Sequence, residues 1–173
     1  MKRAVIGLAL AAALCSGCGK DSSVVEKTPV SAFSAGFQAA VEDFETAGQI
    51  KIQGDGTFTF TLTEPETLAQ LQGYGNPDGL VIELEEVSIA GSSSTLPTRS
   101  VGMLLYQMMD VFARMEEEGQ SRRGEEAGVF LCEGPSAWGD YRITADSESC
   151  LPQRLEFPEQ EAWIQFTFPQ ASS

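Results

Sequence analysis

The sequence contains no histidine. Histidine is the commonest general base near neutral pH, a member of serine-histidine triads and a frequent metal ligand, so its absence removes most hydrolytic schemes and all histidine-based metal sites. Asp140, Asp146 and Glu148 lie close in sequence but lack the oxygen-ligand spacing of a calcium loop. Gly54-Asp55-Gly56 is too short to cradle a phosphate. We therefore predict a noncatalytic protein without metal ligands or cofactor; only a carboxylate pair from distant strands, as in glycosidases, stays open.

Basic residues are few. Lysine and arginine number 11 against 25 aspartates and glutamates, which gives a formal charge of −14. Loss of Lys2 and Arg3 with an export signal would lower the charge of the remaining chain from −14 to −16. So acidic a surface repels nucleic acid and anionic headgroups. We expect no nucleic-acid partner and interpret most of the acidic residues as a solvated surface rather than a cation site.

Long hydrophobic runs are also absent. A helix that spans a bilayer needs about 20 apolar residues, and no run in this sequence is that long. The apolar run at residues 4–14 follows Lys2 and Arg3 and precedes small residues around a cysteine. This pattern is typical of an export signal. We expect residues 1–17 to form a signal peptide and the rest of the chain to be exported.

Cys18 follows Ser16 and Gly17, which resembles the lipobox of bacterial lipoproteins, although Cys15 stands where an aliphatic residue is usual. The resemblance implies that Cys18 is lipidated and becomes the first mature residue. Each buried methylene of such a lipid contributes about 0.8 kcal/mol to membrane anchoring. We expect Cys18 to hold the protein on the extracytoplasmic face of the cell membrane; a secretory signal cut near Gly17 and an uncleaved anchor are the alternatives.

The region after Cys18 divides into a tether and a domain. Residues 18–31 lack an apolar period and are typical of a lipid anchor followed by a flexible tether. Residues 32–170 have the length of a single domain. Hydrophobic residues make up 42% of the chain and ten of them are phenylalanines, enough for a packed core.

Cys132 and Cys150 remain after the signal and the anchor, and an exported pair suggests a disulfide. Residues 129–132 and 140–145, however, have the pattern of two hairpin strands, with Cys132 beside the turn and Cys150 beyond the far end. At ~3.3 Å per residue the two would be on the order of 20 Å apart. A disulfide needs α-carbons within roughly 7 Å. We predict that they are not joined, unless the hairpin is misread.

Strict alternation predicts several strands. Residues 57–63 place Phe58, Phe60 and Leu62 on one face and four threonines on the other. Residues 50–53 alternate likewise across a glycine-containing turn, which predicts a hairpin. Residues 80–89 alternate except at Glu85-Glu86, which we interpret as a bulge. Further strands are expected at 141–145, 155–157 and 164–168, in an antiparallel meander.

One long helix is expected from Ser100 to Glu118, with Thr98 or Ser100 as its cap. Its helically spaced apolar residues include four of the five methionines, which suits either a pocket for flexible acyl chains or core filling against a sheet. The segment at 33–45 fits both a helical stripe and a strand, and periodicity does not decide between them.

The short motifs are Thr63-Glu64-Pro65-Glu66-Thr67-Leu68, Asp78-Gly79-Leu80, Leu96-Pro97-Thr98-Arg99-Ser100 and residues 144–157. In this order, with a long helix and a closing meander, the chain resembles small bacterial lipoproteins of unassigned function that are similar to the LolA-like lipoprotein-carrier superfamily of LppX and LprG type. The resemblance implies an α+β fold, a curved antiparallel half-barrel with one long helix packed on its concave face. It also implies that residues 33–45 form strand and that an apolar cavity can hold acyl chains.

Two hypotheses on function follow. In the first, the half-barrel binds a lipid or another apolar molecule between the sheet and the helix; the ligand-binding residues expected from the pattern are Phe58, Phe60, Leu62, Leu104, Met108 and Met115. In the second, the same faces close a dry core, and the protein is an interaction or structural module of the cell envelope. A carrier leaves a cavity of several hundred cubic ångströms, whereas a filled core packs densely. Trp138 and Trp163 would mark a ligand mouth, a partner surface or ordinary packing. The sequence indicates no particular protein partner.

Overall fold

A computed structural model describes residues 28–169, except 77, 93, 119–121 and 127. The predicted signal peptide, Cys18 and most of the tether therefore lie outside the described residues. The elements are β1 (Phe33–Val41), β2 (Phe44–Ile52), β3 (Phe58–Glu64), η1 (Glu66–Leu68), β4 (Gln72–Asn76), β5 (Gly79–Leu84), β6 (Val87–Gly91), α1 (Val101–Glu118), β7 (Arg122–Glu126), β8 (Val129–Ser136), β9 (Gly139–Asp146), β10 (Pro152–Phe157), η2 (Pro158–Gln160) and β11 (Ala162–Thr167), where η marks a 3₁₀ helix.

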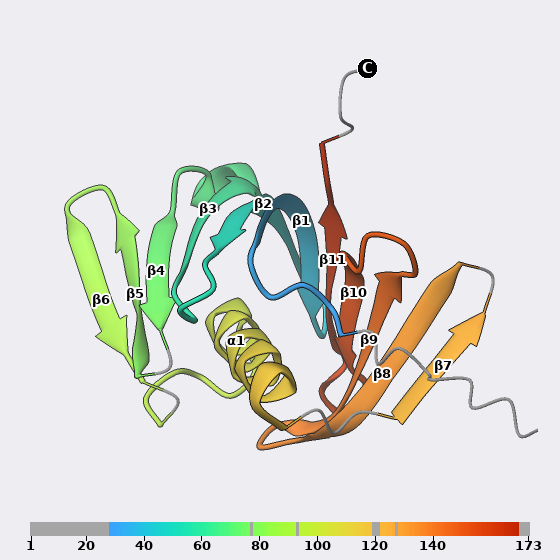
Figure 1. Cartoon of the computed structure of the whole chain (residues 1–173). Coiled ribbons are helices and arrows are strands. Elements are labelled where there is room, and N and C mark those ends of the chain that lie inside the picture. The colour runs from blue at the N-terminus through green and yellow to red at the C-terminus, as the bar shows by residue number, and fades with distance from the viewer. Residues whose placement is uncertain (1–27, 77, 93, 119–121, 127, 170–173) are drawn as a thin grey trace, which may run out of the picture.

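The strands form one antiparallel sheet in the order β6-β5-β4-β3-β2-β1-β11-β10-β9-β8-β7. Strands that follow one another in sequence are neighbours in the sheet, except β6 and β7, which lie at its two edges; β1 also pairs with β11, which joins the meander β1–β6 to the meander β7–β11. The sheet curves around α1 without closing, because β6 and β7 are separate edges (Figure 1). The predicted fold class, a curved antiparallel half-barrel with one long helix on its concave face, is confirmed.

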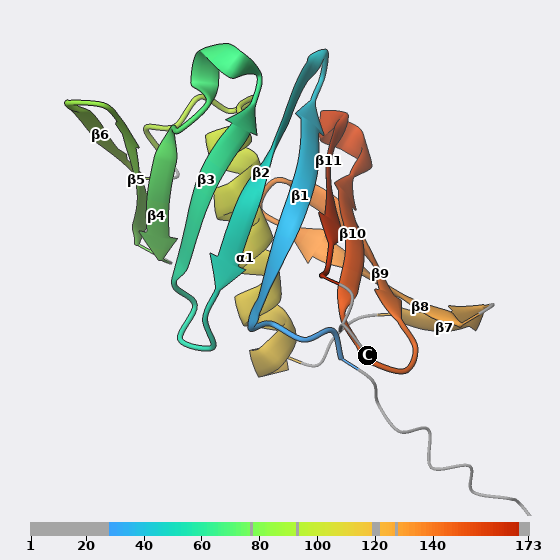
Figure 2. The ribbon, with the colours of Figure 1, turned by 90° about the horizontal axis from the view of Figure 1, so that it is seen from above.

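The long helix is the connection between the two edges of the sheet. Figures 1 and 2 show α1 lying along the concave side of the arch, in contact with β1, β4 and β5. Ser100 caps its start: the Ser100 hydroxyl accepts a hydrogen bond from the Met103 N–H at 3.1 Å and donates one to the Pro97 carbonyl at 2.8 Å. The predicted helix is confirmed, with Ser100 rather than Thr98 as the cap.

The predicted hairpin between residues 50–53 and 57–63 is also confirmed. Ile52 pairs with Phe58 across it, and the Asp55 carboxylate accepts hydrogen bonds from the Thr57 hydroxyl at 2.7 Å and the Thr57 N–H at 2.9 Å. These two bonds, the side-chain bond first, hold the pKa of Asp55 below its ordinary value. The turn thus orders β3 so that its apolar face points into the half-barrel.

Strand β4 is a glycine platform that the alternation pattern does not reveal. Gly73 lies opposite Phe60, and Gly75 lies opposite Phe58. The two phenylalanine rings are stacked, with centroids 6.3 Å apart and planes 19° from parallel. A β-carbon on Gly73 would lie 2.3 Å from the Phe60 ring, and one on Gly75 would lie 2.4 Å from the Phe58 ring. Glycine is therefore required here because the rings lie directly over the β4 backbone.

Two segments have more turns than expected. The predicted bulged strand at 80–89 is wrong: Leu84 pairs with Val87, so β5 and β6 form a hairpin, and Glu85 turns the chain with φ of 52°. A tight turn breaks the alternation in the same way as a bulge, which explains the error. The segment at 33–45 is strand, as the resemblance implied, and reverses at Glu42 with φ of 53°.

No disulfide joins Cys132 to Cys150, as predicted. Cys132 is buried in β8 opposite Ile143, and Cys150 lies in the turn after β9. The β8–β9 turn is shorter than the gap expected between strands at 129–132 and 140–145, because the two strands pair as far as Ser136 and Gly139. The separation of the cysteines follows from the hairpin, since the turn that holds Cys150 lies past the end of β9 remote from the β8–β9 turn.

We predict that Gly73→Ala lowers the free energy of unfolding by about 1 to 3 kcal/mol, because the added methyl group overpacks the site. Besides the Phe60 ring, it would lie 2.9 Å from the Val81 carbonyl oxygen, which cannot move independently of the sheet. Urea denaturation measures the change. Gly36→Ala is the matched control, since a β-carbon there meets its nearest atom at 3.5 Å. Equal effects of the two substitutions would contradict the platform.

We also predict that Ser100→Ala costs about 1 kcal/mol of stability, because the Met103 N–H loses its capping acceptor. Ser100→Asp keeps an acceptor and adds a negative charge at the helix start, so its stability should stay near that of the native chain. Thermal unfolding followed by circular dichroism compares the three proteins. An Asp variant as unstable as the Ala variant would exclude capping as the cause.

Candidate apolar ligand site

The six predicted ligand-binding residues belong to one apolar cluster. From β3 come Phe58, Phe60 and Leu62, with exposed fractions of 0%, 4% and 4%. From α1 come Leu104, Met108 and Met115, with 0%, 0% and 6%. The structure therefore buries all six in the same core, three on the sheet and three on the helix. In the described conformation they are covered by other side chains, and their role toward a ligand stays a prediction.

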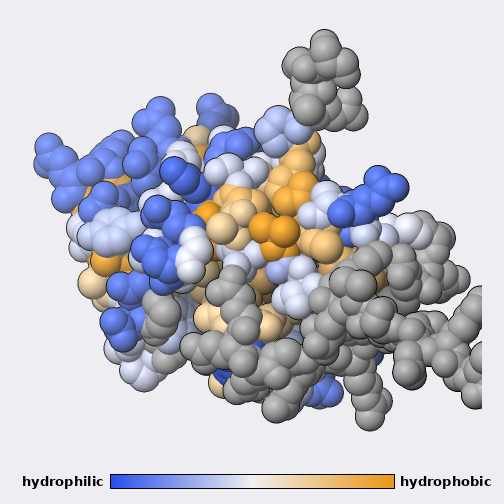
Figure 3. All heavy atoms as spheres, viewed as in Figure 1, coloured by the Kyte–Doolittle hydropathy of each residue, from blue (hydrophilic) through white to orange (hydrophobic). Residues whose placement is uncertain are grey.

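An aromatic cluster fills one end of the half-barrel. Phe33 at the start of β1 contacts Phe112 of α1, with ring centroids 5.9 Å apart, and the rings of Phe166 and Phe168 at 5.1 and 5.5 Å. All three pairs have edge-to-face geometry, which is favourable for aromatic rings. Figure 3 shows hydrophobic residues gathered on this face of the molecule, between the arch of the sheet and the helix. Phe33 joins the helix to the sheet at this end.

The apolar concave surface continues beyond the helix onto β5 and β6. Ile82 and Ile89 are in register with Phe60 and Gly73, and Leu84 is in register with Val87. Cross-strand partners share a face of an antiparallel sheet, so these side chains lie on the concave side. We call Ile82, Leu84, Val87 and Ile89 the overhang.

The helix leaves most of the overhang uncovered. Gly102, at the start of α1, lies against Leu80 and Ile82. Farther out, Val87 and Ile89 are 60% and 63% exposed. Sequence reasoning missed this surface because it treated residues 80–89 as one strand. The regular apolar spacing on both sides of Glu85-Glu86 was the signal that could have revealed it.

A separate groove of about 690 Å³ lies over β3–β6. Its lining includes Thr57, Thr59, Tyr74, Val81 and Ala90. These positions alternate with the core residues of their strands, so most of the groove belongs to the outer face of the sheet. Of the six predicted ligand-binding residues, Phe58 lines it. This groove is therefore not the expected cavity between sheet and helix.

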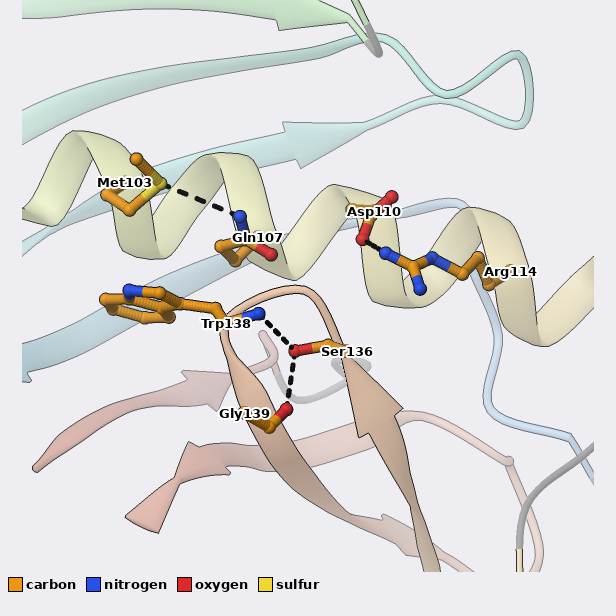
Figure 4. Close-up of polar contacts among 7 residues, drawn as sticks. All are labelled: Met103, Gln107, Asp110, Arg114, Ser136, Trp138 and Gly139. Carbon is orange, nitrogen blue, oxygen red and sulfur yellow. Dashed lines mark hydrogen bonds and ion pairs between the residues drawn. The ribbon is translucent and has the colours of Figure 1, made fainter. Parts of the chain in front are cut away.

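Two buried polar side chains lie where the β8–β9 turn meets α1: Gln107 on the helix and Trp138 in the turn (Figure 4). Gln107 donates from Nε2 to the Met103 sulfur at 3.7 Å, while its Oε1 has no hydrogen-bond partner among the described residues. Trp138 lies in the β8–β9 turn, packs edge-to-face on Phe157 at 5.0 Å, and its Nε1 likewise lacks a described partner. Each such group costs about 1 to 3 kcal/mol.

The two tryptophans have different environments. Trp138 is 6% exposed, and its backbone N–H donates to the Ser136 hydroxyl, which itself donates to the Gly139 carbonyl. It closes the β8–β9 side of the helix, so the packing interpretation fits it. Trp163 is half-buried on β11, with the Arg154 guanidinium 4.4 Å from its ring centroid.

Of the three carboxylates noted in the sequence, that of Asp146 has structural partners. Asp146 accepts hydrogen bonds from the backbone N–H groups of Glu148 and Ser149 and from the Ser149 hydroxyl, which orders the turn after β9. Glu133 binds Arg142 at 2.7 Å and raises the pKa of that guanidinium. Within the described part of the chain, no three acidic or cysteine side chains gather as metal ligands, and no helix is both long and apolar enough to cross a membrane.

No protein-family model matches the sequence, and no curated protein matches it either. Among solved structures, an uncharacterized conserved protein from Thermus thermophilus is similar, with 11% identity and a TM-score of 0.49 over 80% of this chain and 79% of that chain. A LolA superfamily protein from Nitrosomonas europaea has 15% identity and a TM-score of 0.38 over 76% of this chain and 67% of that chain. The lipoprotein LppX from Mycobacterium tuberculosis has 12% identity and a TM-score of 0.36 over 82% of this chain and 89% of that chain. The resemblance that the sequence motifs indicated is confirmed to this extent: structures of LolA and LppX type are among the neighbours, while the half-barrel itself is established by the strand order and pairing.

Proposed function

We propose that the protein is an exported lipoprotein, anchored through Cys18, that binds a lipid or another apolar molecule on the concave side of its half-barrel. The observation that carries the proposal is the overhang, where Val87 and Ile89 expose most of their surface beside the apolar core. Fully burying one such side chain contributes roughly 1.5 to 3 kcal/mol. An acyl chain laid along the overhang would gain part of this free energy without disturbing the sheet.

The helix supplies a way for such a ligand to reach the six core residues. Met103, Met108, Met109 and Met115 are all buried in α1. Methionine is unbranched and its thioether is polarizable, so a methionine-rich face can repack around an inserted chain. A ligand that starts on the overhang would meet Leu80 and Ile82 next, then the space between β3 and α1. Phe58, Phe60, Leu62, Leu104, Met108 and Met115 are its proposed contacts there.

A second candidate function is favoured by the glycine platform. The Phe58 and Phe60 rings lie over Gly75 and Gly73, and this arrangement fills the concave surface with the chain's own side chains. In this alternative the core stays closed, and the protein acts as an interaction or structural module of the envelope. The two candidates differ in whether an apolar ligand binds at one equivalent per chain.

We predict that the chain from residue 18 onward, carrying Cys18→Ser and exposed to a total membrane-lipid extract, retains one lipid in native mass spectrometry. Ile89→Glu should lower the occupancy about tenfold, because the ligand would have to desolvate a carboxylate. Ile89 is mostly exposed in the protein alone, so this change should not affect folding. Phe44→Glu is the matched control, since Phe44 is 43% exposed in the β1–β2 hairpin, away from the overhang.

Lipid adducts that vanish in Ile89→Glu but persist in Phe44→Glu would support the carrier. Bare protein at every lipid concentration, with all three chains folded, would refute it and leave the envelope module. Adducts equal in all three would place the ligand elsewhere than on the overhang.

For the anchor, we predict that the chain produced with its own residues 1–17 partitions into the detergent phase of Triton X-114, whereas Cys18→Ser partitions into the aqueous phase. The reason is that diacyl chains on Cys18 would supply most of the membrane affinity of so acidic a protein. Intact mass spectrometry should find a mature chain that starts at a lipid-modified Cys18. Cys150→Ser is the control, and an identical partition of all variants would contradict lipidation.

A further inference from the structure

The two edges of the sheet differ in chemistry. In β7, four of the five residues of Arg122–Glu126 are charged, whereas Val87–Gly91 in β6 has the sequence Val-Ser-Ile-Ala-Gly, with no charge and no proline. Exposed edges offer unpaired backbone groups to any extended chain, and natural sheets usually protect them with charged residues, prolines or bulges. The β7 edge has charged residues of this kind, and the β6 edge has none.

The β6 edge is accessible. Every residue from Val87 to Ala90 is exposed, and among the described residues no strand pairs with β6 on the side away from β5. Figures 1 and 2 show β6 at the outer margin of the sheet, with no described element beside it. The regular pairing from Leu84–Val87 to Leu80–Gly91 shows that β6 is a regular strand, so the backbone groups on its other side are spaced to pair with a further strand.

We propose that the β6 edge binds an extended segment of a protein partner as a twelfth strand of the sheet, and that this segment alternates apolar and basic residues. Backbone hydrogen bonds to β6 would provide much of the affinity, as in other cases of strand addition. The apolar residues of the segment would lie beside Val87 and Ile89 on the concave face. The basic residues would lie on the outer face, beside Ser88 and Ala90.

The negative charge around β6 favours basic residues in the partner segment. Residues 52–98 contain seven aspartates and glutamates and no lysine or arginine. Glu83 is in register with Ser88, so it lies two strand spacings, roughly 10 Å, from a residue of the incoming strand opposite Ser88. A lysine side chain can extend across the small Ser88 toward the Glu83 carboxylate. Glu85 and Glu86, in the adjoining turn, add to the negative potential along the edge.

A second copy of this chain fits the edge less well. If two β6 edges paired, residues 52–98 of the two copies would come together. The charged side chains of this region are all negative, and like charges oppose association. The proposed partner segment is therefore a different chain, and the inference does not depend on whether the half-barrel binds a lipid.

The test uses the full lipoprotein in phosphatidylcholine nanodiscs and a fluorescent peptide, Val-Lys-Ile-Lys-Val-Lys-Ile, followed by fluorescence anisotropy. The same peptide methylated on every backbone nitrogen keeps the charge but has no N–H group left to pair with an edge. We expect saturable binding of the first peptide and at least about tenfold weaker binding of the second, since strand pairing contributes more than the charges alone. Amide hydrogen exchange at residues 87–90 should slow only with the first.

Two variants locate the site. Ile89→Lys adds to β6 a charge like those of β7, and Glu83→Gln removes the opposing carboxylate; each should weaken binding about tenfold or more. Phe44→Lys, on the β1–β2 hairpin, should bind like the native chain. Equal binding of the methylated peptide, no binding, or equal affinity of Ile89→Lys would overturn the proposal. Self-association that increases with protein concentration and competes with the peptide would overturn it in favour of a second copy.

Discussion

A curved sheet that does not close must cover its concave face, and most of the structure depends on how this chain does so. Each phenylalanine, leucine or isoleucine on that face gains roughly 1.5 to 3 kcal/mol when it is buried. The covering element is α1, which lies in sequence between β6 and β7, the two edges of the sheet. A chain that leaves one edge and must begin the other has to cross the half-barrel, so the connection and the cover are the same eighteen residues. The Ser100 cap and the apolar helix face both serve this one crossing.

One helix is too narrow to cover eleven strands evenly, and the asymmetry of the molecule follows from this. A helix with its side chains is about 10–12 Å across, whereas neighbouring strands are spaced at about 4.8 Å. On one flank the β8–β9 hairpin curls under α1, and Trp138 in its turn packs beside the helix (Figures 1 and 4). On the other flank the sheet extends past the helix, and Val87 and Ile89 stay exposed on β6. The closed flank includes the polar atoms of Gln107 and Trp138 that have no hydrogen-bond partner among the described residues, and the open flank is apolar.

The parts that the sequence predicted correctly are those in which one face of an element decides the pattern. Alternation in residues 57–63 and helical spacing after Ser100 each follow from contact with a single core, so β3 and α1 were predicted with their buried faces. Strand β4 was not predicted, because Gly73 and Gly75 are poor strand formers and owe their position to the rings above them. The common burial of the six candidate residues follows from these faces, but the overhang does not, because it depends on how far the helix reaches across the sheet.

The filled core and the proposed ligand site are related through the free energy of repacking. In the described conformation the phenylalanine rings on the glycine platform and the methionines of α1 occupy the concave surface. An acyl chain gains about 0.8 kcal/mol for each methylene that it buries, so a long chain can offset the displacement of several side chains. Displacing a methionine side chain costs less packing free energy than displacing a branched one, because several methionine rotamers pack acceptably. The overhang reduces the cost further, since a ligand bound there already buries its first methylenes before α1 has to move. The dense core of the described conformation is therefore compatible with a carrier, because the methionines of α1 can repack and one flank of the helix is open.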